Sequence, residues 1–448
     1  MKIMVHSNSP WASCYDEKTE VLTKRGWLLF EQVVKRDEVM TLHPEKLEME
    51  WQNPIRLIEQ RVDNKDMVKI NGLSVDLLLT PNHSLFLAKP QSDSSWKWMF
   101  DRADNAYGKA HNRFIRSGSW KGINSNEFIL PNTDRRIPME SWVRFMGFYL
   151  SEGYIDHNAA NNGYGNYTIT LCQNEEGLPK LAQALSQVSS SKLNYLLGRK
   201  VLIRDKDLWS YLKQFGYAGE KFIPQDIKEL SPYFLNIFLD AYIFGDGSRN
   251  GNRISITTSS LKMRDDLTEV AIKAGYGATS GIHMKKGEQY GKFGPAKSDG
   301  WIIYLSKTRI QPVINKTGKA YSKEEYSGIV RCVEVPNHTL LVRRNGKSVF
   351  CGNSGYGGQT RYLTQYLLKL GHKAAVSAFY GLQGTKMEAN GVEIYPVGLD
   401  GWGNDIVDSH ADHFGADMVI SLIDVWVLKD FGKKLPGRWY PWFPLDGE

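Results

Sequence analysis

Val349-Phe350-Cys351-Gly352-Asn353-Ser354 is the stretch that decides how the rest of the chain is interpreted. An asparagine followed by a hydroxyl residue can cut its own backbone, because the side-chain amide of Asn353 can attack its own carbonyl and close a succinimide. This reaction is very slow in an ordinary loop, where most Asn-Ser pairs are plain turn residues. The dipeptide gains meaning from three upstream features: Cys14, Thr80-Pro81-Asn82-His83, and Val333-Glu334-Val335-Pro336-Asn337-His338.

Length and composition indicate a multidomain globular protein. The chain has 448 residues, which predicts two to four domains, and 42% hydrophobic residues, which is ordinary for a protein with a packed core. The four cysteines form no CxxC pair and no metal-ligand spacing, so reduced thiols and a cytoplasmic location are expected. No apolar run reaches the length of a membrane helix, and no membrane partner is expected.

The positive charge is concentrated in the middle of the chain. The net charge is +7, and residues 136–325 contain 25 Lys and Arg against 19 Asp and Glu. A polyanionic partner is therefore expected to bind this middle part.

The chain falls into stretches of different character. From Cys14 onward, short apolar runs alternate with turns, which predicts an all-β region. Residues 118–132 are rich in Gly, Ser and Asn and are expected to form a linker. Beyond them the pattern predicts an internal duplication, in which each copy has an apolar helix followed by a strand. The helices are expected over 141–150 and 231–244, the strands over 167–171 and 253–258.

The two ends of the chain, taken together, give a more complete domain pattern than either end gives alone. If residues 14–353 are removed, strand Lys2–His6 leads through a glycine-rich loop into a helix at 360–370 and a strand at 374–377. This β–loop–α–β order is typical of nucleotide-binding α/β domains, in which the loop amides and the helix N-terminus bind phosphate. Closing a flexible loop of this length would cost about 5 kcal/mol, so the insert is expected to be a folded unit whose ends meet. The candidate phosphate-binding glycines are Gly355, Gly357 and Gly358.

These motifs carry a family resemblance. Residues 14–353 resemble an intein of the Hint (Hedgehog/intein) fold that carries a LAGLIDADG homing endonuclease. The splicing motifs are Cys14, Thr80-x-x-His83, Pro336-Asn337-His338 and Gly352-Asn353-Ser354. The stretches at 145–153 (FMGFYLSEG) and 239–247 (LDAYIFGDG) match the two endonuclease motifs. Residues 1–13 and 354–448 resemble, more loosely, the N-terminal half-domain of a GT-B glycosyltransferase.

The resemblance implies a multidomain fold: an all-β Hint splicing domain, an α+β LAGLIDADG endonuclease domain inserted in it, and a flanking split α/β Rossmann-like fragment. The expected boundaries are an N-extein at 1–13, the N-terminal part of the Hint domain at 14–135, the endonuclease at 136–325, the C-terminal part of the Hint domain at 326–353 and a C-extein at 354–448.

The splicing motifs imply a set of roles. Cys14 would attack the Ser13 carbonyl to form a thioester, because a thiolate is both a good nucleophile and a good leaving group. His83 would protonate the departing nitrogen, with Thr80 orienting the bond. The Ser354 hydroxyl would take the acyl group, and cyclisation of Asn353 would release the insert. Splicing needs no cofactor.

Two positions depart from the family pattern. Gly352 stands where the family usually has histidine, so His338 is expected to assist Asn353 alone and splicing could be slow. Cys332 stands where many relatives have aspartate. It could relay a proton or be a small buried residue, and the sequence leaves both open.

The endonuclease motifs imply a metal-dependent hydrolase. Two helices packed through Gly147, Ala241 and Gly245 would bring Glu152 and Asp246 together to bind Mg2+. Lys221 matches the family's active-site lysine. Two motif copies in one chain imply a monomer that binds an asymmetric double-stranded DNA site. Candidate DNA contacts, mostly to phosphate, are Arg249, Arg253, Lys285, Lys286, Lys292 and Lys297.

Two alternatives stay open. In the first, splicing is impaired and the unspliced chain acts as a DNA endonuclease. In the second, the flanking glycosyltransferase-like fragment, with a nucleotide-sugar partner, carries the main activity.

Overall fold

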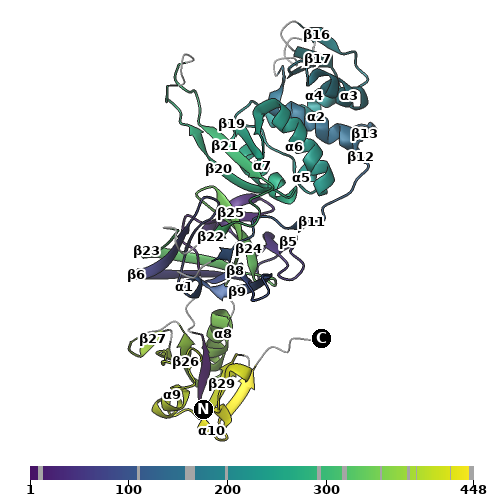
Figure 1. The fold of residues 1–448 in the computed structure, drawn as a ribbon. Helices are drawn as coiled ribbons and strands as arrows, with labels where there is room; N and C mark the ends of the chain where they lie inside the picture. Colours follow the sequence, from purple (N-terminus) through teal and green to yellow (C-terminus); the bar gives the residue numbers. More distant parts are fainter. Residues whose placement is uncertain are drawn as a thin grey trace.

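The computed structural model describes residues 1–8, 14–107, 111–156, 167–196, 200–289, 294–314, 320–353, 356–380, 384–389, 391–423 and 425–442. Three bodies follow one another along the long axis of the molecule (Figure 1). The lower body contains elements from both ends of the chain, the middle body is rich in strands, and the upper body holds most of the long helices. None of the helices in the described ranges is long and apolar enough to cross a membrane.

The lower body is a mainly parallel sheet built from both sides of the 14–353 segment. Strand β1 (Lys2–Asn8) lies between β26 (Lys373–Tyr380) and β29 (Met418–Leu422) and runs parallel to both. Both strands predicted for the joined ends are present, and they lie side by side, with Ile3 opposite Ala374. The sheet order is β27-β28-β26-β1-β29-β30. The other elements are α8 (Tyr356–Lys369), β27 (Met387–Ala389), β28 (Val392–Tyr395), α9 (Val407–Phe414), η4 (Val425–Val427), α10 (Phe431–Lys434) and β30 (Trp439–Trp442).

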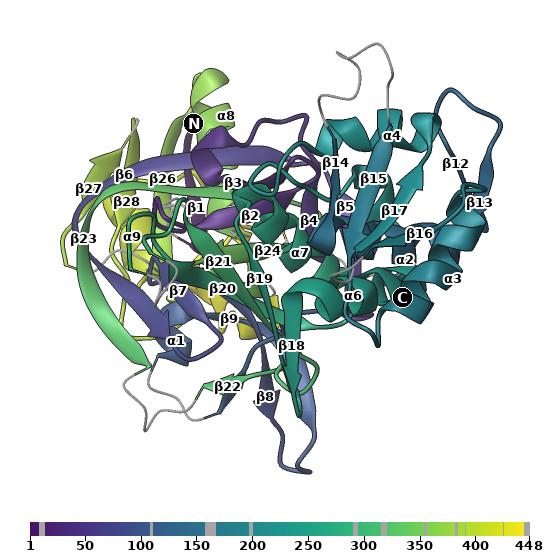
Figure 2. The same cartoon turned by 90° about the horizontal axis from the view of Figure 1, so that it is seen from above.

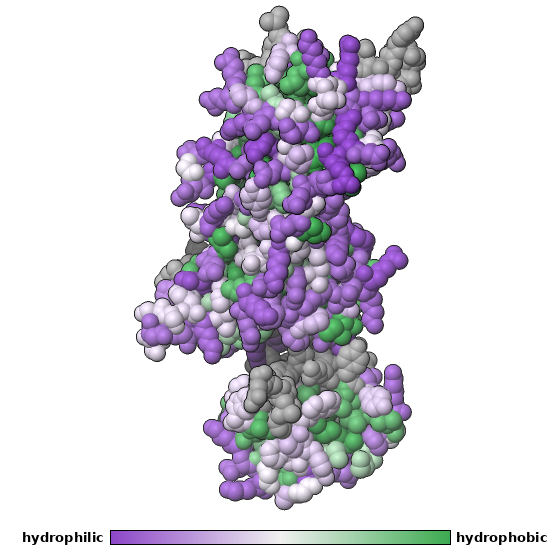
Figure 3. Space-filling model, turned by 90° about the vertical axis from the view of Figure 1, so that its right-hand side faces the viewer, coloured by the Kyte–Doolittle hydropathy of each residue, from purple (hydrophilic) through white to green (hydrophobic). Residues whose placement is uncertain are grey.

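The surface of the lower body differs from that of the two others. Hydrophilic side chains cover most of the visible face of the upper and middle bodies, and hydrophobic ones gather more densely on the lower body (Figure 3). Its exposed large hydrophobic residues include Leu399, Trp402, Trp426, Tyr440 and Trp442.

The middle body is almost entirely β-structure. Two long strands, β6 (Arg56–Asn71) and β23 (Tyr321–Glu334), pair antiparallel, and β7 (Asp76–Leu79) pairs with β6. A second sheet has the order β22-β10-β8-β9, made of Val313–Ile314, Asn112–Arg113, Ser84–Pro90 and Trp96–Arg102. In the described part of residues 14–117 the helical elements are the short turns η1 (Phe30–Gln32) and α1 (Ala103–Ala106), so the predicted all-β region is confirmed.

One long sheet crosses from the middle body into the upper body. Its order is β11-β5-β4-β2-β24-β25-β20-β21-β19-β18, with β3 (Gly26–Leu29) beside β2. The crossing pair is β25 (Lys347–Gly352) with β20 (Gly277–Met284), where Thr279 lies opposite Lys347. The remaining strands are β11 (Ser119–Trp120), β5 (Glu48–Gln52), β4 (Val39–Leu42), β2 (Glu20–Thr23), β24 (Thr339–Arg344), β21 (Gly300–Ser306), β19 (Arg253–Thr258) and β18 (Gly247–Asn250).

The prediction that residues 118–132 form a linker is wrong. Strand β11 joins the long sheet beside β5, and β12 (Glu127–Ile129) pairs with β13 (Arg136–Pro138). The Trp120 indole N–H also donates to the carbonyl of Leu230. The local composition, rich in Gly and Ser, could not predict these contacts, because the residues that the segment pairs with lie far away in the sequence.

The upper body contains the predicted duplication, which is confirmed. Helix α2 (Met139–Glu152) and helix α6 (Pro232–Asp246) each run directly into a strand. The sheet of the first copy has the order β14-β15-β17-β16, and the second has the matching order β18-β19-β21-β20. In Figure 2 the strands of the first copy lie to the right of those of the second. The other elements are β14 (Gly153–Ile155), β15 (Thr168–Cys172), α3 (Leu178–Val188), β16 (Asn194–Leu196), β17 (Lys200–Arg204), α4 (Lys206–Leu212), η2 (Lys213–Phe215), α5 (Gln225–Lys228) and α7 (Leu261–Lys273).

Candidate functional site

Cys14 is held at the start of the middle body by Thr80. The backbone N–H of Cys14 donates to Thr80 Oγ1 at 3.0 Å, and the backbone N–H of Thr80 donates to the Cys14 carbonyl at 3.1 Å. His83 follows one turn later, and its backbone N–H donates to the Thr80 carbonyl at 2.9 Å. Cys14 and His83 are fully buried. Thr80 therefore contacts the nitrogen of the peptide that Cys14 would have to break.

The two ends of the 14–353 segment meet at the carbonyl oxygen of Gly352. The Tyr15 hydroxyl donates to this oxygen at 2.6 Å, and His83 Nε2 lies 2.9 Å from it. Because a carbonyl oxygen can only accept, Nε2 of His83 carries a hydrogen. In the structure, His83 thus contacts the peptide group that precedes Asn353. The role expected for His83 at the Ser13–Cys14 peptide stays a prediction. Ser13 lies outside the described residues.

Asn353 is buried and held by contacts on its backbone and its side chain. Its backbone N–H donates to the His338 carbonyl at 3.0 Å, and its Nδ2 donates to the Val333 carbonyl at 3.1 Å. His338 Nδ1 lies 3.3 Å from Asn353 Oδ1, so in this arrangement the imidazole donates and polarises the amide. The expected acceptor of the acyl group, Ser354, lies outside the described residues.

Three thiols surround the Tyr15 phenol. Burial raises the pKa of Tyr15 well above its usual value, and nearby Cys351, Cys332 and Cys14 raise it further. Burial likewise raises the pKa of the Cys351 thiol to about 12. Cys332 is buried and its Sγ donates to the Val333 carbonyl at 3.5 Å, the same carbonyl that accepts from Asn353. Cys332 thus lies beside Asn353, and both of its possible roles stay open.

Tyr15 is the residue at this site that sequence reasoning missed. Its ring stacks on Phe30 at 5.1 Å and meets the His83 ring edge-on at 4.3 Å. The available signal was its place directly after Cys14. A buried aromatic residue is usually part of the core, so this signal did not distinguish a role at the site.

The second site lies where α2 and α6 end. A Cβ on Gly147 would lie 2.5 Å from the Phe238 carbonyl oxygen and 2.7 Å from the Ala241 Cβ, so the two helices touch at their backbones. A Cβ on Gly245 would lie 2.9 Å from the Glu152 Cγ. The predicted close approach of the helices through these small residues is confirmed, and it places Glu152 next to the residue before Asp246.

Glu152 and Asp246 face one another closely enough to interact. Burial, and then the negative charge of Glu152, raise the pKa of Asp246 to about 7, while Lys221 opposes the shift. Two neighbouring carboxylates at partly exposed helix ends are a donor set that suits a divalent cation such as Mg2+. The described residues contain no group of three or more His, Cys, Asp or Glu side chains that could bind a metal. The Glu152–Asp246 pair fits a metal ion whose coordination shell is completed by water or phosphate oxygens.

Lys221 lies behind this pair and caps α2. Its Nζ donates to the carbonyls of Tyr149 at 2.9 Å, Leu150 at 3.1 Å and Gly153 at 2.7 Å. Burial lowers its pKa to about 8, although Asp246 and Glu152 oppose this. An ammonium group has three donors, and all three are used here. Its expected catalytic role stays a prediction.

The structure places most of the other predicted residues, and their expected roles stay predictions. Arg249, Arg253, Lys285, Lys286 and Lys297 lie on or beside the sheet β18-β19-β21-β20, and Arg249 forms an ion pair with Asp240. The helix predicted at 360–370 begins earlier, at Tyr356, so Gly357 and Gly358 belong to it and not to the expected loop. Lys292 and Gly355 lie outside the described residues.

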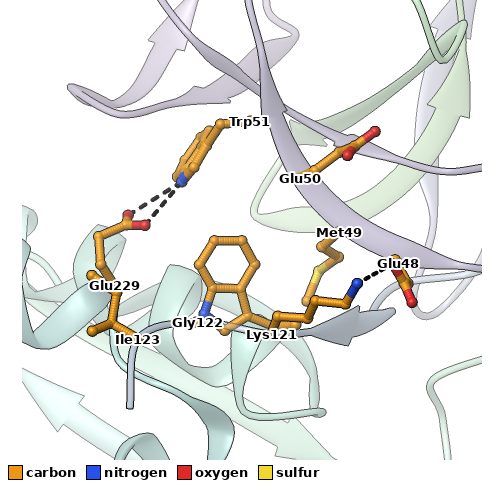
Figure 4. Close-up of a pocket in the computed structure, with 9 residues that line it drawn as sticks. Glu48, Met49, Glu50, Trp51, Lys121, Gly122, Ile123 and Glu229 are labelled. Carbon is orange, nitrogen blue, oxygen red and sulfur yellow. Dashed lines mark hydrogen bonds and ion pairs between the residues drawn. The ribbon is translucent and has the colours of Figure 1, made fainter. Parts of the chain in front are cut away.

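A pocket lies between the middle and upper bodies (Figure 4). Its volume is about 330 Å³, and its lining includes Trp51, Trp120 and Glu229. The Trp51 indole N–H donates to both carboxylate oxygens of Glu229, at 3.2 and 3.1 Å. Lys273 Nζ lies 4.8 Å from the ring of Trp51 and 4.6 Å from that of Trp120. This pocket is at the N-terminal side of α6, away from Asp246, and its contacts join the two bodies.

No family model matches the chain. It is 26% identical over 420 residues to the DNA-directed RNA polymerase subunit beta C-terminal section of Stigeoclonium helveticum, covering 82% of this chain and 38% of that protein. It is 23% identical over 376 residues to the ATP-dependent Clp protease proteolytic subunit of Chlamydomonas moewusii, covering 78% and 36%. It is 23% identical over 220 residues to the replication factor C small subunit of Thermococcus kodakarensis (strain ATCC BAA-918 / JCM 12380 / KOD1), covering 48% and 22%. The chain thus spans well under half the length of each relative.

Solved structures similar to parts of this chain include a homing endonuclease and inteins. I-DmoI in complex with DNA and Ca has 12% identity and a TM-score of 0.29, covering 38% of this chain and 83% of that one. The AceL NrdHF class 3 split intein has 19% identity and a TM-score of 0.20, covering 28% and 71%. The DnaX mini intein from Spirulina platensis has 20% identity and a TM-score of 0.18, covering 23% and 67%.

Proposed function

We propose that residues 14–353 are a self-splicing intein that excises itself and joins residues 1–13 to 354–448. The observation that carries the proposal is the meeting of both ends of the segment at the Gly352 carbonyl, through Tyr15 and His83. The parallel pairing of β1 with β26 supports it, because the flanking residues already form one sheet.

The curated relatives add a second argument. Their names describe an RNA polymerase, a protease and a replication factor, which share no activity. A segment that recurs in such different proteins is expected if it is an insert and not part of the host activity.

The first half of the reaction exchanges an amide for a thioester. The Cys14 sulfur attacks the Ser13 carbonyl carbon, the Ser13–Cys14 C–N bond breaks, and the freed amine takes up a proton. Thr80 Oγ1 accepts from the Cys14 N–H and so orients this nitrogen. The Ser354 oxygen then displaces the Cys14 sulfur and carries the acyl group as an ester.

The second half releases the insert. Asn353 Nδ2 attacks its own carbonyl carbon, the Asn353–Ser354 C–N bond breaks, and a proton moves from Nδ2 to the Ser354 amine. His338 Nδ1 polarises the side-chain amide, and the Val333 carbonyl accepts from Nδ2. The free amine of Ser354 then attacks the ester and restores an amide between Ser13 and Ser354.

We further propose that residues 136–325 are a LAGLIDADG-type DNA endonuclease that acts as a monomer on double-stranded DNA. Glu152 and Asp246 would hold Mg2+, which stabilises the phosphate transition state and activates water when bound. The raised pKa of Asp246 agrees with this assignment, because burial and, after it, the nearby charge of Glu152 both disfavour its ionised form, and a bound cation would offset both. The residues on the sheet β18-β19-β21-β20 would contact phosphates.

The flanking unit is proposed as a Rossmann-like, glycosyltransferase-like fragment that takes a nucleotide-sugar, within a cytoplasmic protein. The parallel order of β28, β26, β1, β29 and β30 supports this part of the proposal.

Expression of the full chain tests splicing directly. Mass analysis is expected to show an excised piece of 340 residues and a joined piece of 108 residues. The double variant Cys14→Ala, Asn353→Ala is expected to stay intact. An intact wild-type chain would favour the alternative of a splicing-impaired endonuclease.

A cleavage assay tests the nuclease. DNA spanning the uninterrupted host site is expected to be cut in Mg2+ and to survive in EDTA. Asp246→Asn is expected to abolish cutting while DNA binding in a gel-shift assay is kept. Cutting that is unchanged in Asp246→Asn would refute the metal assignment.

A further inference from the structure

Tyr15 has no role in the reaction described above, yet its hydroxyl has a rigidly defined position. Its backbone N–H and carbonyl both pair with Arg331, each at 2.9 Å. Its fully buried ring is stacked on Phe30 and edge-on to His83. The hydroxyl that donates to the Gly352 carbonyl at 2.6 Å is therefore fixed by the main chain and by packing.

This hydrogen bond immobilises one side of the peptide group that precedes the reacting Asn353. On the oxygen side of the Gly352–Asn353 peptide are Tyr15 and His83. On the nitrogen side, the Asn353 N–H donates to the His338 carbonyl at 3.0 Å. With this peptide plane held from both sides, the Nδ2 of Asn353 has only its own torsions to adjust before it reaches its carbonyl carbon.

We propose that Tyr15 is a positioning residue for the cyclisation of Asn353. The inference rests on the proposed splicing function and adds a residue to its last cleavage step. During that step the Nδ2–C bond forms and the Asn353–Ser354 C–N bond breaks, while Tyr15 keeps its proton. Its high pKa agrees with this, because the phenol stays a neutral donor over the whole working range. Intramolecular reactions lose much of their rate when the reacting atoms are displaced by a fraction of an ångström to an ångström.

A purely structural role for Tyr15 is the competing explanation, since a buried phenol needs some acceptor. The two explanations differ in which step they affect. A positioning role at Asn353 slows only the C-terminal cleavage. A structural role disturbs Cys14 as well, because Cys14 is the neighbouring residue.

The test measures each cleavage alone in the full-length chain, with and without Tyr15→Phe. In a Cys14→Ala background, release of residues 354–448 reports Asn353 cyclisation. In an Asn353→Ala background, release of residues 1–13 by dithiothreitol reports the thioester. Tyr15→Phe is expected to slow the first about tenfold, by the same factor at every pH from 6 to 9, and to change the second less than twofold.

Tyr321→Phe is the matched control. It removes a hydroxyl that accepts from Asn112 Nδ2 at 2.8 Å in the same body, away from Asn353, and is expected to change neither rate. Equal slowing of both cleavages, no slowing of either, or a shifted pH profile for Tyr15→Phe would overturn the positioning role. If the two parent backgrounds release no fragment at all, the proposed splicing function fails, and this inference fails with it.

Discussion

A Cβ on Gly352 would lie 2.3 Å from the carbonyl oxygen of Ser84 and 2.9 Å from its carbonyl carbon. Strand β25 thus ends in direct backbone contact with the start of β8, and the contact leaves no space for a side chain. The resemblance drawn from the sequence implies a histidine at this position, where the chain has Gly352. In the structure, the neighbouring backbone leaves no room for a side chain at position 352. Tyr15 and His83 both contact the carbonyl oxygen of Gly352.

Placing a histidine at position 352 is therefore expected to harm the protein. Gly352→His and Gly352→Ala should both lower the melting temperature and slow splicing, because overpacking a closed site costs about 1–3 kcal/mol. Gly281→Ala is the control, since a Cβ there meets no atom within 4 Å. Thermal melts and a time course of spliced product measure both effects. Faster splicing in Gly352→His would show that β8 can move aside.

Gly147→Ala is expected to push α2 and α6 apart. The added methyl group would meet the Phe238 carbonyl oxygen at 2.5 Å, and helix backbones yield less readily than side chains. We expect a loss of about 1–3 kcal/mol in the free energy of unfolding of the upper body, measured by urea denaturation. Gly219→Ala, with no atom within 4 Å, should leave the free energy of unfolding nearly unchanged.

Lys228 supplies positive charge to a buried cluster of charged side chains between α5 and α7. Its Nζ lies 3.1 Å from Asp266 and 3.0 Å from Glu269, and all three side chains are almost fully buried. Burial would raise the pKa of Glu269, but Lys273 and Lys228 outweigh it and hold the pKa below its ordinary value. Lys228→Ala is expected to cost roughly 3–5 kcal/mol, because it removes the buried cation that Asp266 and Glu269 share and leaves each carboxylate with one lysine fewer.

Lys262 provides the matched control for this cluster. It pairs with the same Asp266 at 3.4 Å, but its side chain is 59% exposed. Lys262→Ala should cost less than about 1 kcal/mol in the same urea titration. Equal effects of the two lysine substitutions would contradict the importance of burial.

The lower body is expected to lose stability in mild acid. His6 Nε2 lies 2.9 Å from the Trp402 carbonyl, its Nδ1 lies 3.1 Å from Ser377 Oγ, and burial lowers its pKa from 6.5 to about 4. Since the folded pKa is below the unfolded one, the stabilisation is complete above pH 6.5 and is lost as the pH falls from 6.5 towards 4. For His6 the loss reaches roughly 3 kcal/mol. Burial also lowers the pKa of His410 to about 4, which adds to the effect.

Hydrogen exchange followed by mass spectrometry checks this pH dependence. Peptides of β1 and β26 should lose protection between pH 7 and pH 5 after correction for the intrinsic exchange rate. Peptides of β6, which contain no histidine, serve as the internal reference. Parallel changes in both sets of peptides would argue against the histidines as the cause.

The local sequence pattern was sufficient to predict the helices and strands whose hydrophobic periodicity is strong or whose partners are close in the chain. Helices α2 and α6 and strand β19 lie within a few residues of their predicted bounds. The segment 118–132 failed because β11 is ordered by β5, about 70 residues earlier, and local composition holds no trace of that partner.

The residue types alone were enough to propose a chemistry. A thiol at position 14, an amide at 353 and a hydroxyl at 354 are the groups that the proposed splicing would use, so the sequence by itself determined which bonds are the candidates for cleavage. Which groups touch was decided only by the tertiary structure. Tyr15 and Gly352 are separated by 337 positions, and no periodicity links them. They meet because long-range pairing brings the chain at Tyr15 and the end of β25 into one core, where a buried donor must find an acceptor.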